Sequence, residues 1–336
     1  MKAIQKKTSF SVLGTGSWGT ALVKILTENG YSVRWWGRNK SRIKEIKSTG
    51  TNPHYLTSVS FVKSRVKTTH RINRAVDGSN YVVFAIPSAF LKEAVEKLEP
   101  KHFKGKEVIC CIKGVVPGED LSCVDFLKQR FSIPDENITL VSGPTHAEEI
   151  ALRKLSYLTV VNKDIDKAKA IQKSFSSSYI ETNVLSDVEG VEYSSIIKNV
   201  ISIACGVAHG LKYGDNFQAV LVANAVKEIT AFLDTVCPMD RNINHSVYLG
   251  DVLVTAYSQF SRNRTLGSML GKGYSVKAAM ADMTMVSEGY YAAKSIYKIA
   301  MDKGTSDLPI CFTVYRILYQ NANAEQEFKN LRGKLM

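Results

Sequence analysis

The sequence predicts an α/β domain followed by an all-α domain. In the first half of the 336-residue chain, short apolar runs alternate with helical patterns. Apolar strands separated by helices indicate a parallel sheet that is covered on both faces. Beyond about residue 185 long helical periodicity replaces the strand patterns. We therefore expect residues 1–187 to form the first domain and residues 188–336 the second.

Each element follows from its local pattern. Strands are expected at residues 10–14, 32–36, 80–86, 107–112, 138–141 and 156–161. Helices of the first domain are expected at residues 19–29, 40–47, 89–98, 121–131 and 165–175. Helices of the second domain are expected at residues 188–210, 216–237, 247–260, 275–281, 288–303 and 310–319.

The charge of the chain is unevenly distributed. The net charge is +13, and residues 1–74 hold 15 Lys and Arg against two acidic residues. The remainder has equal numbers of each sign, which excludes a uniformly basic protein. No apolar run approaches the ~18–20 residues of a membrane span, and the apolar stretch after the basic N-terminus is too short for a signal peptide. The six cysteines show no CxxC spacing. We expect buried thiols, a cytoplasmic location and no integral membrane segment.

A glycine motif follows the first expected strand. It reads Gly14-Thr15-Gly16-Ser17-Trp18-Gly19 and opens the first helix. The first glycine of such a motif permits a tight turn, the second lets a pyrophosphate approach the backbone, and the third lets helix and strand pack closely. The pyrophosphate then lies at the positive helix N-terminus. The motif predicts a Rossmann-type dinucleotide-binding domain; the alternative is a plain glycine turn.

The end of the second strand bears on the choice of cofactor. An NAD site usually has an acidic residue there for the ribose 2′-hydroxyl, whereas residues 34–40 contain none. Arg38 has the geometry to pair with a 2′-phosphate, with Arg34 and Lys40 assisting. This favours NADP(H), or the use of both cofactors; the alternative is that these are solvated surface cations.

Lys198 is the main candidate for acid–base chemistry. It lies in a helix that is apolar on nearly every side, so its amine either reaches solvent along the surface or is held in a cleft. In a cleft, desolvation lowers the pKa and makes a neutral amine available as a base. Asn199 is its neighbour, and Gly206 and Gly210 on the same helix allow close approach of a backbone or a ligand.

Further polar residues point to an anionic substrate. Asp251 and Thr255 are four residues apart, on one face of a helix. Ser261-Arg262-Asn263-Arg264 suits a phosphate or carboxylate, although an isolated tetrapeptide of this kind is more often a basic turn. Lys113 follows directly after a strand, at the edge where parallel sheets bind ligands.

Together these residues resemble the NAD(P)-dependent sn-glycerol-3-phosphate dehydrogenases, particularly the bacterial type. The resemblance covers nearly the whole length and keeps the family's order and spacing. Its motifs are Gly14–Thr20, Asn52-Pro53-His54-Tyr55-Leu56, Ala85-Ile86-Pro87-Ser88, Lys113-Gly114, Ser142-Gly143-Pro144-Thr145, Asp187–Glu192, Lys198-Asn199-Val200, Gly214-Asp215-Asn216, Gly250-Asp251 and Ser261–Arg264.

The resemblance implies hydride exchange between a nicotinamide and C2 of sn-glycerol 3-phosphate or dihydroxyacetone phosphate, in an enzyme that feeds glycerophospholipid synthesis. It implies that Lys198 is the acid–base, with Lys113 and Asp251 as the other catalytic residues and no metal. The implied substrate ligands are Lys113, Gly143, Thr145, Lys198, Asn199, Asp251, Thr255, Ser261, Arg262 and Asn263. The implied cofactor contacts are Gly14, Gly16, Ser17, Trp18, Gly19, Arg38, Lys113, Ala147, Arg262, Val286 and Glu288. Fold-level analogy adds a homodimer.

The chain departs from the family pattern at three places. These are residues 244–249, residues 223–225 and the pair Thr145-His146. All three lie outside the acid–base residues, so the expected reaction stays the same, while substrate affinity and the shape of the pocket are in question.

Two alternative functions stay open. A β-hydroxyacid dehydrogenase or ketopantoate reductase shares the architecture and a catalytic lysine, although Ser261–Arg264 favours a phosphate over a free carboxylate. The remote alternative is a nucleic-acid-binding or scaffolding protein that uses the basic cluster Lys63, Arg65, Lys67, His70, Arg71 and Arg74. No RNA-binding motif with interleaved aromatic residues supports it, so we expect no nucleic-acid partner.

Overall fold

The structure is a computed structural model that describes residues 9–283, 286–305 and 307–335. The basic N-terminal residues 1–8, which entered the expectation about a signal peptide, lie outside the described residues. The chain forms two compact units. The sheet unit comprises Met1–Ile112 and Cys123–Val188, and the helical unit comprises Lys113–Ser122 and Glu189–Met336.

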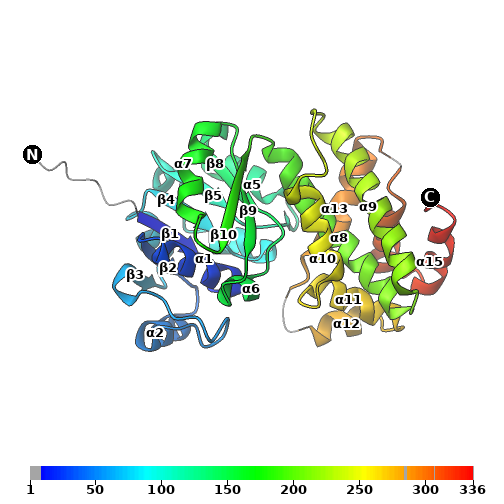
Figure 1. Ribbon diagram of the computed structural model, residues 1–336, viewed down its shortest axis with the longest axis horizontal. Helices are drawn as coiled ribbons and strands as arrows, with labels where there is room; N and C mark the ends of the chain where they lie inside the picture. Colours follow the sequence, from blue (N-terminus) through cyan, green and yellow to red (C-terminus); the bar gives the residue numbers. More distant parts are fainter. Residues whose placement is uncertain (1–8, 284–285, 306, 336) are drawn as a thin grey trace, which may run out of the picture. The chain divides into compact units, whose positions relative to one another are not determined.

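The sheet unit is built on eight strands in the order β10-β9-β8-β5-β4-β1-β2-β3 (Figure 1). Their bounds are β1 Ser9–Leu13, β2 Ser32–Trp36, β3 Val66–Thr69, β4 Tyr81–Phe84, β5 Glu107–Cys110, β8 Ile138–Ser142, β9 Ser156–Val161 and β10 Ile180–Leu185. The six strands from β3 to β8 are mutually parallel, in the order of a doubly wound dinucleotide-binding sheet. The order reverses between β1 and β4, where such sheets bind their ligands.

One pair of strands departs from the expected parallel arrangement. β9 pairs antiparallel with β8, and β10 pairs parallel with β9. The segment between β8 and β9 holds only the short helix α6 (Ala147–Ala151), which is too short for the usual parallel crossover.

Both faces of the sheet are covered by helices. In β1, Phe10 and Val12 belong to one buried core together with residues of α1, α6 and α7. On the other face, Phe84 of β4 contacts Phe103, whose ring lies 4.3 Å from that of Phe131 in α5. Strand residues alternate between the two cores, as the period of two requires. The helices are α1 Ser17–Glu28, α2 Lys40–Thr49, α3 Ile72–Val76, α4 Leu91–Ala94, α5 Cys123–Phe131 and α7 Ile165–Phe175, and the 3-10 turns are η1 Lys63–Arg65, η2 Ser88–Phe90, η3 Pro100–Phe103 and η4 Asp135–Asn137.

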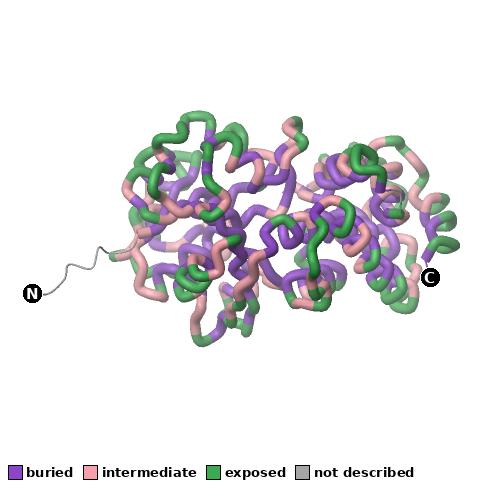
Figure 2. The backbone as a smooth tube through the Cα atoms, turned by 90° about the horizontal axis from the view of Figure 1, so that it is seen from above, coloured by how far each residue is buried: buried purple, intermediate pink, exposed green. Residues whose placement is uncertain are grey.

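The helical unit is organised around α8, Val188–Gly210. The other helices are α9 Gly214–Val236, α10 Asp251–Tyr257, α11 Arg262–Gly271, α12 Val276–Asp282, α13 Glu288–Asp302, α14 Pro309–Tyr319 and α15 Ala324–Arg332, and a π-helical turn, η5 Ser246–Gly250, leads into α10. Among the described residues α8 alone is long and apolar enough to cross a membrane, but 94% of its apolar window is buried inside the protein. Figure 2 shows buried backbone concentrated inside each unit. α8 is therefore a core helix.

Glycines bring α8 and α11 into backbone contact. A Cβ on Gly206 of α8 would lie 2.1 Å from the Arg264 carbonyl oxygen, and one on Gly267 of α11 would lie 2.0 Å from the Ile203 oxygen. Gly210 and Gly271 repeat this contact one turn further on. The expected close approach at Gly206 and Gly210 is thus an approach of backbone. It brings the N-terminus of α11, with Asn263, close to α8.

The segment Lys113–Ser122 differs from the expected division at residue 187. It forms a small hairpin in which β6 (Val115–Val116) pairs with β7 (Leu121–Ser122), and it packs with the helical unit. Lys298 of α13 donates to Asp120 of the hairpin at 2.5 Å. The strand expected at residues 107–112 therefore ends at Cys110, and Lys113 belongs to the helical unit.

Other elements also differ from expectation. The helix expected at residues 89–98 is reduced to η2 and the short α4, and the one expected at 247–260 is divided into η5 and α10. The strands β3 and β10 and the helices α3, α6, α11 and α15 were not predicted. β3 and β10 each contain three consecutive polar residues, and the 23-residue helices α8 and α9 dominate the periodicity of the second half.

Candidate functional site

The glycine turn lies where β1 ends and α1 begins. Gly14 has φ +124°, and a Cβ there would lie 2.2 Å from the carbonyl oxygen of Ala85, which follows β4. A Cβ on Gly19 would lie 2.3 Å from the Gly14 oxygen, so these two glycines permit close packing. Gly16 differs, because no protein atom lies within 4 Å of its Cβ position. The open side of the turn is therefore at Gly16.

The N-terminus of α1 suits an anion. No side chain caps the helix at Gly16, and the first turn contains no acidic residue. Ser17 and Trp18 are its first two residues. An uncapped helix N-terminus beside open space at a glycine is the arrangement in which a pyrophosphate binds. The residues present thus fit a dinucleotide.

Asn52 holds the glycine turn in place. Its side-chain amide donates to the Thr15 carbonyl oxygen at 2.9 Å and to the Thr20 hydroxyl at 2.8 Å, and the residue is buried. The Trp35 indole donates to the Gly14 carbonyl oxygen at 2.7 Å. Neither residue was assigned a role from the sequence. The signals for Asn52 were its place before a proline and its membership of the motif Asn52–Leu56.

Arg38 follows β2 at the same edge of the sheet. Its side chain is 61% exposed, lies over the Phe90 ring at 4.8 Å and pairs with Glu93 at 3.4 Å. Arg34, expected to assist it, donates to the Gly78 carbonyl oxygen at 3.0 Å, at the other end of the strand. Arg38 is accordingly accessible to a ligand, while Arg34 is held at the amino end of the sheet.

The residues after β8 also belong to the sheet unit. Gly143 has φ +139°, and its carbonyl oxygen accepts from the Thr145 backbone at 2.9 Å. Ala147 is the first residue of α6 and is buried. Gly143, Thr145 and Ala147 thus lie beyond the carboxyl end of β8, in the same unit as the glycine turn.

The helical unit contains a buried cluster of charged groups. Lys198 of α8 donates to Asp251 Oδ1 at 2.5 Å and to the Thr255 hydroxyl at 3.0 Å. Lys113 of the hairpin donates to Asp251 Oδ2 at 3.0 Å. Asp251 is 1% exposed, Lys198 6% and Thr255 7%. One carboxylate therefore lies between two ammonium groups, and the Lys113 side chain, 21% exposed, leads to the surface. We call Lys113, Lys198 and Asp251 the lysine–aspartate cluster.

The cluster sets the protonation of its members. Burial, together with the neighbouring Lys113 charge, lowers the pKa of Lys198 to about 7, against the opposing effect of Asp251. Burial alone would raise the pKa of the Asp251 carboxyl, but the two ammonium groups outweigh it and hold that pKa below its ordinary value. Asp251 stays ionised, while Lys198 can gain or lose a proton near neutral pH.

A buried chain of amides supports Lys113. Asn199 donates to the Lys113 carbonyl oxygen at 2.9 Å and accepts from Asn263 at 2.9 Å. Asn263 in turn accepts from the Ser287 hydroxyl at 2.7 Å and from the Gly289 backbone at 3.0 Å. Both asparagines are engaged by protein groups. Ser287, which was not among the predicted site residues, is the last member of this hydrogen-bonded series.

The N-terminus of α11 lies beside this chain of amides. Ser261 caps the helix and shares a 2.7 Å hydrogen bond with the Ser202 hydroxyl. Arg262 is exposed, and its guanidinium donates to the Val286 carbonyl oxygen at 3.5 Å. Glu288 begins α13, two residues beyond Val286. Arg262 is the member of the Ser261–Arg264 motif with an accessible charged group.

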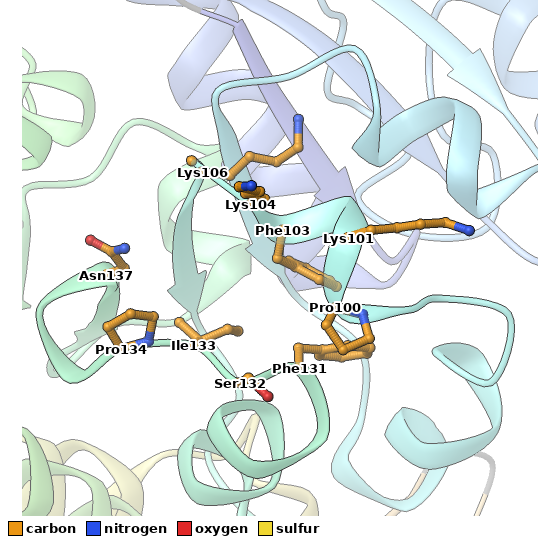
Figure 3. Close-up of a pocket in the computed structure, with 11 residues that line it drawn as sticks. Pro100, Lys101, Phe103, Lys104, Lys106, Phe131, Ser132, Ile133, Pro134 and Asn137 are labelled. Atoms are coloured by element: carbon orange, nitrogen blue, oxygen red, sulfur yellow. The ribbon is translucent and has the colours of Figure 1, made fainter.

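A cavity of about 380 Å³ lies elsewhere, at the amino ends of β5 and β8 (Figure 3). The Lys106 amine donates to the Ser79 carbonyl oxygen at 2.7 Å and Lys101 pairs with Glu99, so both point away from the Phe103 and Phe131 rings. The glycine turn is at the opposite edge of the sheet. This cavity is not part of the site.

No group of three or more His, Cys, Asp or Glu among the described residues could hold a metal ion. All six cysteines are buried. The polar chemistry of the site comes from lysine, aspartate, arginine, hydroxyl and amide groups.

Comparison with known proteins identifies the family. The model of the NAD-dependent glycerol-3-phosphate dehydrogenase N-terminus matches residues 9–168, and that of the C-terminus matches residues 187–329. The chain belongs to the NAD-dependent glycerol-3-phosphate dehydrogenase family. The two matches cover both units, so this family is favoured over the related dehydrogenases and the nucleic-acid-binding alternative.

Individual relatives show the same match. The glycerol-3-phosphate dehydrogenase [NAD(P)+] of Streptococcus suis is 34% identical over 329 residues, covering 97% of this chain and 96% of the relative. That of Latilactobacillus sakei is 33% identical over 325 residues, covering 96% and 95%. The crystal structure of glycerol-3-phosphate dehydrogenase from Coxiella burnetii has a TM-score of 0.90 and 25% identity, and covers 97% of this chain and 98% of its own. The predicted two-part fold is confirmed.

Proposed function

We propose that this family member interconverts sn-glycerol 3-phosphate and dihydroxyacetone phosphate with NAD(P). The observation that carries the proposal is the lysine–aspartate cluster, in which Lys198 has a pKa of about 7. A secondary alcohol must lose its hydroxyl proton as C2 releases a hydride, and a buried amine of this pKa suits that transfer. The nicotinamide cofactor, when bound, accepts or supplies the hydride.

Lys198 is the proposed acid–base. In oxidation its neutral amine takes the C2 hydroxyl proton, and in reduction its ammonium gives a proton to the oxygen of the forming alkoxide. Asp251 orients the amine through the 2.5 Å hydrogen bond and balances the charge of the ammonium. Thr255 accepts a second hydrogen bond, so the amine has a fixed direction.

Lys113 and Arg262 are the proposed ligands of the anionic substrate. Lys113 is held by Asp251 and, through its carbonyl oxygen, by Asn199, and its side chain reaches the surface. Arg262 offers the planar donor geometry that binds phosphate. Ser261 and Asn263 position the start of α11, and they remain predicted ligands together with Asn199, Thr255, Gly143 and Thr145.

The glycine turn is the proposed cofactor site. Gly16 supplies the open backbone and α1 the helix N-terminus, with Ser17 and Trp18 in the first turn. Exposed Arg38 at the end of β2 supports a preference for NADPH through a 2′-phosphate contact. Ala147, Val286 and Glu288 remain predicted cofactor contacts.

The remaining parts of the proposal concern the setting of the enzyme. The burial of all six cysteines supports a reducing cytoplasm. The sn-glycerol 3-phosphate that the enzyme makes would enter glycerophospholipid synthesis. The expected assembly is a homodimer. Light scattering coupled to size exclusion would test the dimer.

The decisive assay follows oxidation of NADPH and of NADH by dihydroxyacetone phosphate, with ketopantoate as the competing substrate. We expect turnover with dihydroxyacetone phosphate and a higher kcat/KM with NADPH. Turnover with ketopantoate alone would instead support the related reductase. A folded sample without turnover on either substrate would refute the proposal.

A further inference from the structure

The edge of the sheet at β3 carries a dense cluster of basic side chains. β3 is the last strand in the sheet order, and α2 and α3 both pack against it. Figure 1 shows α2 and β3 together at this end of the sheet unit. We call the exposed cations here the basic surface: Lys40, Arg42, Lys44, Lys47, Lys63, Lys67, Arg71 and Arg74.

The basic surface has almost no balancing charge. Between residues 29 and 76 the only acidic residue is Glu45, which pairs with His54 at 3.1 Å, and the next one, Asp77 at the end of α3, lies 4.0 Å from His102. Within the described part of the chain, none of the eight cations forms an ion pair with a carboxylate. The substrate phosphate is assigned to Arg262 in the helical unit, and Arg38 is sufficient for a 2′-phosphate. Apart from Lys40, which is expected to assist Arg38, the proposed reaction therefore leaves the cations of the basic surface without a role.

We propose that the basic surface docks the enzyme reversibly on a bilayer that contains anionic phospholipid. A negatively charged bilayer attracts clustered Lys and Arg without needing a defined sequence. Val62, 40% exposed beside Lys63, offers an apolar contact within the cluster. No Phe, Tyr or Trp side chain between residues 40 and 74, a segment the structure describes throughout, is exposed, so the segment lacks the large aromatic rings on which single-stranded nucleic acid usually stacks.

The chemistry of the product supports a lipid surface as the partner. This step rests on the proposed function. The product, sn-glycerol 3-phosphate, has two free hydroxyl groups. Acyl transfer to both of them consumes it and gives a bilayer lipid. Docking at an anionic bilayer would release the product where its consumers act.

Co-sedimentation with vesicles tests the proposal on the full chain. We expect binding to phosphatidylcholine vesicles that contain phosphatidylglycerol at about 50 mM salt, with loss at high salt as screening increases. Vesicles of phosphatidylcholine alone should not bind. A variant with Lys44→Gln, Lys47→Gln, Lys67→Gln and Arg74→Gln should bind at least ~10-fold more weakly.

A matched control separates the basic surface from net charge. The changes Lys97→Gln, Lys104→Gln, Lys154→Gln and Lys173→Gln remove the same charge from exposed sites of the same unit, and this variant should bind like the wild type. Equal loss in both variants, or no binding of the wild type to anionic vesicles, would overturn the proposal. Binding to duplex RNA in place of vesicles would also overturn it.

Reduction of dihydroxyacetone phosphate without vesicles should be the same in all three proteins, and its absence would count against the proposed function alone.

Discussion

The two units use different groups for their predicted ligands. At the glycine turn, backbone groups favour the binding of an anion, because the N-terminus of α1 is uncapped and the space at Gly16 is open. The lysine–aspartate cluster instead consists of three charged side chains, of which Lys198 and Asp251 are almost fully buried. Backbone dipoles, which carry no net charge, are therefore enough to bind a phosphate. Proton transfer near neutral pH instead requires a side chain whose pKa has been shifted by burial.

The largest expected effect separates the two regions directly. Lys198→Ala should lower kcat by about 10²–10⁴, the usual contribution of a general acid–base. NADPH affinity, measured by fluorescence titration, should stay the same, because the glycine turn belongs to the other unit. The fold should persist, since Asp251 keeps Lys113 as its partner. Lys294→Ala, an exposed lysine of α13, is the control, and near-normal kcat in Lys198→Ala would remove Lys198 from its role.

The second effect concerns the charge balance of the cluster. Asp251→Asn leaves two ammonium groups without their carboxylate, and removing one partner of a buried pair typically costs about 3–5 kcal/mol. Urea unfolding would measure this loss. The pKa of Lys198 should also fall further, because Asp251 opposes its lowering. Asp302→Asn, at an exposed position, should change stability little, and similar stability of both variants would contradict the account.

The third effect tests the backbone-built region. Gly16→Ala adds a methyl group where no protein atom lies within 4 Å, so the free energy of unfolding should be unchanged. The methyl would obstruct the pyrophosphate, and cofactor binding should weaken roughly 10- to 100-fold. Gly333→Ala, whose Cβ position is equally open, should alter neither quantity. Normal cofactor affinity in Gly16→Ala would place the pyrophosphate elsewhere.

The smallest effect separates the two cofactors. Arg38→Ala should weaken NADPH binding about 10-fold, the scale of one charge-assisted contact at an exposed site, and leave NADH binding unchanged. Isothermal titration with both cofactors measures the two affinities. An equal change for both would show that Arg38 does not contact a 2′-phosphate.

The sequence predicted elements best where helical periodicity was long or where β-branched and aromatic residues were frequent. The helices at residues 165–175 and 188–210 and the strands at 32–36 and 156–161 have the predicted bounds. β3, with the sequence Val-Lys-Thr-Thr, and β10 were missed because three consecutive polar residues interrupt the apolar pattern of each of these edge strands. Their pairing depends on neighbouring strands, which local patterns do not record.

The sequence predicted the residues of the candidate site better than the contacts among them. Lys198, Asp251 and Thr255 could be chosen from their residue types, but the position of Lys113 depends on a hairpin that leaves the sheet unit. Asn52 and Ser287 act through hydrogen bonds to residues distant in the sequence. Such tertiary contacts have no local signature.

The most direct test is the pH dependence of kcat/KM in both directions. Reduction needs the Lys198 ammonium, which predominates below its pKa of about 7, and oxidation needs the neutral amine, which predominates above it. We therefore expect kcat/KM for dihydroxyacetone phosphate reduction to fall, and kcat/KM for sn-glycerol 3-phosphate oxidation to rise, as pH increases through the same midpoint near 7. Flat profiles in both directions, or the same profiles in Lys198→Ala, would contradict the assignment of Lys198 as the acid–base.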